Sequence, residues 1–221
     1  MDHEAGSGAV IDPVMADAMT VKSRLLSDIA ICEPSLHMGP MQSHRQHWTR
    51  TARNALPSGE VQMLREGAFI TPSVVSDQRL GVKPSGLGLY TSTATSAGCS
   101  MWRALMGPDN SMMWPQPWYT WKVDVERDVR VAEIISATRW VELVCNYPRL
   151  SHGLVYPDWA RVARDFDAIH VTLPTVIAAH GFHFACPDRG VIPPAFWDVE
   201  TVLWLKWCFS GAHLVESVGV G

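Results

Sequence analysis

The chain has 221 residues, of which 47% are hydrophobic, so it can bury a packed core and is not a disordered protein. Its 18 basic and 22 acidic residues give a formal net charge of −4, which excludes a basic surface for non-specific binding to a nucleic-acid backbone. This length accommodates one domain with an N-terminal extension, or at most two small domains.

Membrane insertion and secretion are not indicated either. No stretch approaches the roughly 18 uninterrupted apolar residues of a membrane-spanning helix, and the acidic start at Met1–Glu4 does not resemble a signal peptide. The five cysteines are widely spaced and form no CxxC pair, which predicts reduced thiols (Cys32, Cys99, Cys145, Cys186 and Cys208). We therefore expect a cytoplasmic protein that does not bind membranes.

Residues 1–56 are predicted to form an N-terminal extension that is mobile at its start and helical afterwards. Asp12 and Pro13 supply an N-cap and a first-turn proline, and apolar residues then recur at helical spacing, which predicts a helix over about 13–31. Ser43 can cap a second helix, which we expect to run to about Leu56.

Strand patterns dominate residues 57–221, which we treat as the main domain. A short helical piece over 60–66 precedes strand candidates at 86–92, 118–125, 129–136 and 139–145. A helix capped by Asp158 and ending at Asp165, a strand over 168–172 and a final strand over about 200–206 follow. Helices followed mostly by strands indicate an α+β fold, and no GxGxxG segment provides the fingerprint of a doubly wound dinucleotide fold.

Two segments about a hundred residues apart are the most informative. Gly86–Thr93 ends in hydroxyl side chains, and in Trp197–Leu205 an acid-x-acid pair opens an apolar strand. Side chains alternate along an extended chain, so Asp198 and Glu200 are expected to lie on one face. A carboxylate among so many apolar residues is costly to bury without a partner or a purpose, which makes Glu200 the first candidate for a catalytic group.

These segments resemble the two halves of the nicotinamide-dinucleotide site in ADP-ribosyltransferases. Leu89–Thr93 is similar to the aromatic-x-Ser-Thr-Ser strand of the arginine-serine-glutamate transferases, although Ala94 stands where that motif has its last serine. The same strand is also similar to that of the histidine-tyrosine-glutamate class, with Tyr90 as the tyrosine. The class within the family therefore stays open.

Three further motifs carry the same resemblance in chain order. Lys83–Leu87, Asp158–Ala163 and Trp197–Glu200 are similar to a KPxGLW-like strand, a DWxxVA helix and a WDxxS/E end in phage and bacterial proteins with such domains. Gly88 departs from the tryptophan of the first motif. The resemblance covers about residues 60–210.

The resemblance implies split antiparallel β-sheets with flanking helices, NAD as the substrate, and a protein or nucleic-acid acceptor. It assigns Glu200 to stabilisation of an oxocarbenium-like transition state, Asp198 to the acceptor, and the hydroxyl of Ser92 to the support of Glu200. Tyr90 and Trp197 are expected against the nicotinamide ring. The complete set expected around the dinucleotide is Tyr90, Thr91, Thr93, Arg65, Gly88 and Trp197.

The family also places an arginine or histidine on an early strand, where this chain has no clean match. Arg65 is the nearest candidate, with His47 and Arg50 as alternatives. A metal site is not predicted, because the soft ligands His180, His183 and Cys186 lack a second pair at a defined distance. No local signature supports a cysteine–histidine hydrolase.

Two functions stay open. One is an NAD-dependent ADP-ribosyltransferase acting as a phage or bacterial toxin or effector, and the other is a non-catalytic binding or inhibitory protein on the same fold. The first requires Ser92 and Glu200 on neighbouring strands and on one side of the sheet, with a cleft beside them. A Glu200 locked into a buried ion pair favours the second.

Overall fold

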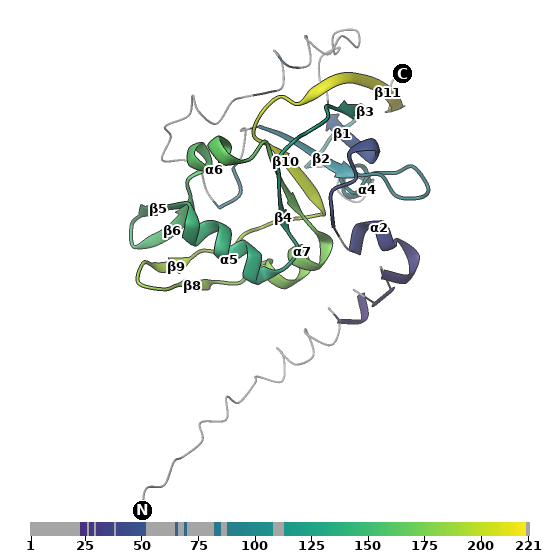
Figure 1. Ribbon diagram of the computed structural model, residues 1–221. Coiled ribbons are helices and arrows are strands. Elements are labelled where there is room, and N and C mark those ends of the chain that lie inside the picture. The colour runs from purple at the N-terminus through teal and green to yellow at the C-terminus, as the bar shows by residue number, and fades with distance from the viewer. Residues whose placement is uncertain are drawn as a thin grey trace, which may run out of the picture.

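The computed structural model describes residues 23–25, 27–28, 30–37, 39–51, 65, 69, 82–84, 88–107 and 113–219. In these ranges the chain forms helices and two β-sheets, which confirms the α+β class (Figure 1). The helix expected over 13–31 and the helical piece expected over 60–66 lie largely outside the described residues. No helix within the described part is long and apolar enough to cross a membrane.

The larger sheet has seven strands in the order β11-β3-β1-β2-β10-β7-β4. Neighbouring strands are antiparallel except β4 and β7, which are parallel. In sheet order the strands are β11 (Phe209–Val218), β3 (Trp118–Val125), β1 (Gln46–Thr51), β2 (Leu89–Thr93), β10 (Thr201–Trp204), β7 (Ala168–Val171) and β4 (Val131–Ile134). The hydroxyl-bearing strand β2 therefore pairs directly with β10, which meets the first of the conditions set for a site shared by the two strands.

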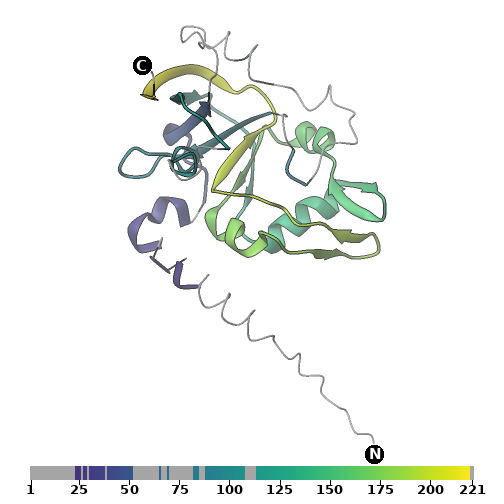
Figure 2. The same cartoon turned by 180° about the vertical axis from the view of Figure 1, so that it is seen from behind.

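A smaller sheet and the longer helices lie together, away from β11 and β3, in both views (Figures 1 and 2). The small sheet has the order β5-β6-β9-β8, with β5 (Pro148–Ser151), β6 (Leu154–Pro157), β9 (Gly190–Ile192) and β8 (Phe184–Cys186). The described helices are α2 (Pro34–His37), η1 (Ser43–Arg45), α4 (Met101–Leu105), α5 (Ala137–Asn146), α6 (Trp159–Asp165) and α7 (Leu173–Ala179).

The seven-stranded sheet separates two apolar cores. Alternate residues of β10 enter opposite cores: Leu203 packs with the residues of α5, α6 and α7, while Val202 and Trp204 pack with Trp48, Trp121 and their neighbours. All four residues of β10 are fully buried. This explains why its sequence is uniformly apolar apart from Thr201, as expected for a central strand.

Two predicted elements are wrong in type. The segment 139–145 belongs to helix α5 rather than to a strand, because Ser136 caps the helix and Trp140, Leu143 and Val144 fall on one buried helical face. The helix expected from Ser43 to Leu56 ends after one turn at Arg45 and continues as β1.

Pairing over long sequence distances explains the second error. Strand β1 lies between β2 and β3 and is hydrogen-bonded to both, and these contacts outweigh the local helical pattern. Residues expected in the N-terminal extension thus contribute a strand to the main sheet. Strand β11 was not predicted, whereas β3, β4, β7 and helix α6 with its Asp158 cap are confirmed.

The cysteines differ in part from the expectation of reduced thiols. Cys145 at the end of α5 and Cys186 at the end of β8 form a disulfide, so the expectation is wrong for these two residues. Cys32, Cys99 and Cys208 are free.

Gly88, directly before β2, adopts a backbone conformation and a close contact that favour glycine. Its φ of 65° lies in the left-handed region, and a Cβ added there would lie 2.2 Å from the carbonyl oxygen of Trp204. We predict that Gly88→Ala lowers the free energy of unfolding by roughly 2–5 kcal/mol, from left-handed strain and overpacking together. Urea denaturation measures this loss.

Gly98→Ala is the matched control. Gly98 also has a positive φ, 80°, but no atom lies within 4 Å of the added Cβ. Only the strain remains there, about 1–2 kcal/mol. Equal losses in the two variants would show that the close approach of β2 to Trp204 is not maintained in solution.

Candidate functional site

A hydrogen-bonded row of polar side chains crosses one face of the seven-stranded sheet. Glu200 Oε1 accepts a hydrogen bond from the Thr93 hydroxyl (2.8 Å), and Glu200 Oε2 accepts one from the Thr93 backbone N–H (2.9 Å). On its other side Glu200 Oε1 lies 3.1 Å from His170 Nε2, and His170 Nδ1 lies 2.6 Å from Glu133 Oε2. Gln46 Nε2 donates to the Thr93 hydroxyl (3.2 Å) and completes the row on β1.

Strand register explains why these five residues meet. Gln46 is paired with Thr93 between β1 and β2, and Glu133 with His170 between β4 and β7. Glu200 directly precedes β10, whose Val202 is paired with both Thr91 and His170. Because alternate residues of a strand share a face, this register turns Thr93, Glu200 and His170 toward one another.

The centre of the row is a buried ion pair. Glu200 is 1% exposed and His170 4% exposed. Burial of the His170 ring opposes its protonation, but hydrogen bonds to Glu133 and Glu200 and the charges of both carboxylates outweigh burial and raise the pKa of His170 to about 9. At neutral pH one imidazolium therefore lies between two carboxylates. Glu133 is also fixed by the backbone N–H of Met41, which donates to its Oε1 (2.8 Å).

Ser92 does not contact Glu200. Its hydroxyl accepts a hydrogen bond from the backbone N–H of Trp102 (3.2 Å) and so holds α4 against the opposite face of β2. Alternation along β2 puts Ser92 on the side away from Thr93. The support that the sequence assigns to Ser92 thus comes from Thr93, one residue later.

Thr91 lies on the same face as Thr93. Its hydroxyl donates to Gln46 Oε1 (2.6 Å) and accepts from Trp204 Nε1 (2.8 Å), so it extends the polar row without reaching solvent. Arg65 is exposed, and the structure does not bring it to the row.

Tyr90, Trp197 and Asp198 do come together, around the side chain of Lys83. Lys83 Nζ lies 2.5 Å from Asp198 Oδ2 and 5.8 and 5.9 Å from the ring centroids of Tyr90 and Trp197. The Tyr90 hydroxyl donates to the carbonyl of Pro84. Burial, and then the charge of Asp198, raise the pKa of Tyr90, so its hydroxyl is a donor at neutral pH. Trp197 is fully buried.

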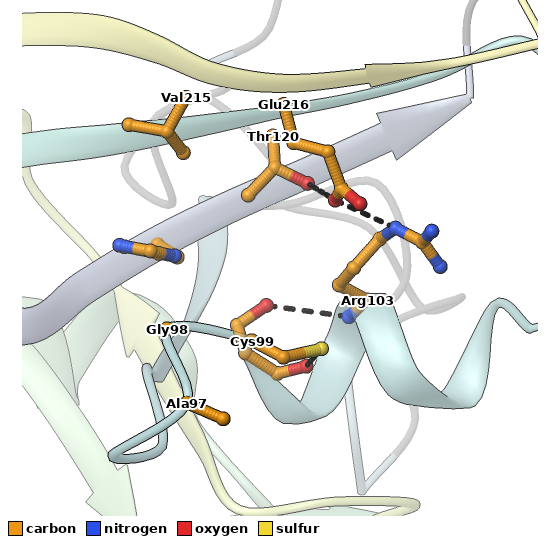
Figure 3. A pocket seen from close by; sticks show the side chains of 9 residues that line it. Ala97, Gly98, Cys99, Arg103, Thr120, Val215 and Glu216 are labelled. Carbon is orange, nitrogen blue, oxygen red and sulfur yellow. Dashed lines mark hydrogen bonds and ion pairs between the residues drawn. The ribbon is translucent and has the colours of Figure 1, made fainter.

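The opposite face of the sheet also carries a pocket of about 440 Å³ (Figure 3). It is lined by His47, Ala97, Gly98, Cys99, Ser100, Arg103, Thr120, Val215 and Glu216. Figure 3 shows Arg103, Thr120 and Glu216 directed toward one another above the turn at Ala97–Cys99, with Arg103 Nε 2.7 Å from Glu216 Oε2.

His47 is the buried titratable group of this pocket. It is 8% exposed, and its Nδ1 is buried without a hydrogen-bond partner. Burial, and then the charges of Lys122 and Arg45, lower the pKa of His47, so the ring is neutral at pH 7. His47 is paired with Ser92 and shares its face, and the pocket is therefore separate from the row around Glu200.

Several residues of these clusters were missed by sequence reasoning. His170 lies within the predicted strand 168–172, but nothing near it in the sequence indicates that it meets an acid 30 residues later. Gln46 is not among the predicted site residues, because the sequence predicts a helix where the structure has strand β1. The sequence places Lys83 only within the Lys83–Leu87 motif, because nothing near it indicates that it meets Asp198, 115 residues later.

Comparison of the chain with protein-family models, with curated proteins and with solved structures finds no match. Within the described residues, no group of three or more histidine, cysteine, aspartate or glutamate side chains is arranged to hold a metal ion.

The raised pKa of His170 predicts a pH dependence of stability. Below about pH 6.5 both the folded and the unfolded chain bind the proton, and the stabilisation is complete. As the pH rises from 6.5 to 9, the unfolded chain loses its proton first, so the free energy of unfolding falls by on the order of 3 kcal/mol. Urea denaturation across this range measures the slope.

Two variants test whether His170 causes the change of the free energy of unfolding with pH. His170→Gln should remove most of it, whereas His213→Gln, which alters an exposed histidine beside Asp124, should leave it in place. A slope that survives in His170→Gln would show that His170 is not the imidazolium between the two carboxylates.

Proposed function

We propose two candidate functions for this chain, of which the first is an NAD-dependent ADP-ribosyltransferase with Glu200 as its acidic residue. The observation that supports this most directly is the pairing of β2 with β10, which lets the hydroxyl and the amide of Thr93 both donate to Glu200. The resemblance requires such an arrangement, a hydroxyl-bearing strand beside the strand that the acid opens. Thr91 and Thr93, rather than Ser92, carry the hydroxyls on the side of the acid.

The proposed reaction replaces one bond at the anomeric carbon of the nicotinamide ribose. The bond from this carbon to the pyridinium nitrogen breaks, and its electron pair leaves with nicotinamide, which becomes neutral. A nucleophile of the acceptor forms the new bond and loses its proton. Positive charge develops on the ribose in between, and a fixed carboxylate at Glu200 would stabilise it.

Three groups of this chain orient the Glu200 carboxylate and stabilise its charge. The two donors of Thr93 fix the direction of the carboxylate, and the imidazolium of His170 offsets the cost of keeping a charge in a buried position. A net charge of −4 leaves the acceptor open between a protein side chain, a nucleic-acid base and a small molecule. The proposal includes an intracellular setting as a phage or bacterial toxin or effector, which rests on the resemblance alone.

A non-catalytic binding or inhibitory protein on the same fold is the second candidate. Glu200 is 1% exposed and is enclosed by partners from its own chain, and a carboxylate in this state does not meet a ribose. Ser92 and Tyr90 point away from Glu200, and the position on β1 beside Thr93 holds Gln46 rather than arginine or histidine. These departures favour the binding protein.

Transfer of label from NAD to macromolecules of a cell lysate, together with NAD hydrolysis, separates the two candidates. Glu200→Gln keeps the shape of the side chain and removes its charge, so we expect turnover to fall by at least about a hundredfold with dinucleotide binding little changed. Thr93→Val removes one hydrogen bond to Glu200 and should cost roughly ten- to hundredfold.

Glu142→Gln is the control, because Glu142 is an exposed glutamate on α5 that pairs with Arg139 in the same helix. Circular dichroism and thermal unfolding establish that each variant is folded. A folded parent that binds NAD but neither hydrolyses nor transfers it supports the second candidate. Equal turnover in the parent and Glu200→Gln would remove Glu200 from the reaction.

A further inference from the structure

The side chain of Lys83 is held in an aromatic cage, which we define as Tyr90, Trp102, Trp197 and Asp198. Lys83 Nζ lies 5.0 Å from the ring centroid of Trp102, in addition to its approach to Tyr90 and Trp197, and it forms an ion pair with Asp198. Three ring faces and a carboxylate around one ammonium group form an arrangement that recognises organic cations.

The walls of the cage are held by the fold rather than by Lys83. Trp102 Nε1 donates to the hydroxyl of Thr201 (2.9 Å), and the Trp102 backbone N–H donates to Ser92. The Trp197 ring is fully buried and packs edge-on against Trp140, with ring centroids 5.7 Å apart. These contacts of Trp102 and Trp197 do not involve Lys83, so both rings keep them when the lysine side chain leaves the cage.

The side chain of Lys83, by contrast, can leave the cage. Lys83 lies outside the helices and strands, and its neighbours are anchored independently: Val82 is buried in the core and the Pro84 carbonyl accepts from Tyr90. The ion pair with Asp198 is partly open to solvent, with the two side chains 21% and 40% exposed, so water weakens it. Rotation of the flexible lysine side chain can empty the cage without unfolding the segment.

We propose that the cage is a binding site for a small organic cation and that Lys83 is its internal pseudo-ligand, which an external cation must displace. Two sources share this chemistry, an alkylammonium group such as a lysine or methylated lysine side chain, and a pyridinium ring such as that of an N-methylated nicotinamide. The site is independent of the polar row, because Tyr90 and Glu200 lie on opposite faces of the seven-stranded sheet. It therefore stands whether or not the chain is a transferase.

An external cation can bind only those molecules in which Lys83 has left the cage. Its apparent dissociation constant is therefore the intrinsic one divided by the fraction of molecules with an open cage. Lys83→Met removes the ammonium group and keeps an unbranched apolar side chain. Isothermal titration calorimetry with tetramethylammonium and with the 1-methylnicotinamide cation should show binding at least about tenfold tighter in Lys83→Met than in the parent, as expected when the open fraction is about one in ten or less.

Lys206→Met is the matched control, because Lys206 pairs with Asp167 away from the cage. It should bind the cations as the parent does, and neutral nicotinamide should gain nothing from Lys83→Met. A preference for one of the two cations identifies the source of the natural ligand. Equal or weaker binding of both cations by folded Lys83→Met overturns the proposal.

A second measurement uses the unmodified chain and does not depend on a variant. Amine acetylation followed by mass spectrometry reports how accessible each lysine is. Saturating cation should raise the acetylation rate of Lys83 several-fold and leave that of Lys206 unchanged. An unchanged or slower rate at Lys83 would show that the cation does not displace it.

Discussion

The burial of one charge, that of Glu200, constrains the sheet more than any other interaction. A carboxylate that is 1% exposed is stable only when donors surround it, and here two come from Thr93 and one from His170. These donors lie on the strands on either side of β10. A shift of either strand by one residue would turn its donor to the other face, so the charge fixes the register of three central strands.

Alternation along β2 and β10 then divides the polar chemistry of the molecule between two faces. Thr91, Thr93 and Glu200 belong to the buried polar row, while Tyr90 forms part of the aromatic cage and Ser92 binds α4 on the other face. Residues adjacent in the sequence thus serve different sites. The aromatic cage and the polar row lie on opposite faces of the same sheet and need not bind the same ligand.

The sequence predicts the features that depend on local chemistry. The cap at Asp158, the alternation in 168–172 and the acid that opens the last central strand all follow from neighbouring residues. Strand β1 and the pairing of Glu200 with His170 could not be predicted in this way, because both depend on partners tens of residues away. The helix over 137–146 was misread because its buried residues also fit a short apolar strand.

The two candidate functions make opposite demands on His170. Its imidazolium neutralises Glu200 in the resting protein, so it occupies the place of the positive charge that a transferase would develop on the ribose. An enzyme must therefore let the substrate compete with His170 for the carboxylate, while His170 keeps its contact with Glu133 through the other ring nitrogen. A binding protein is most stable when Glu133, His170 and Glu200 stay together. Loss of either carboxylate would leave the buried charge of the histidine incompletely compensated. Contact between His170 and Glu200 thus stabilises the fold, whereas a transferase reaction would require that contact to be broken.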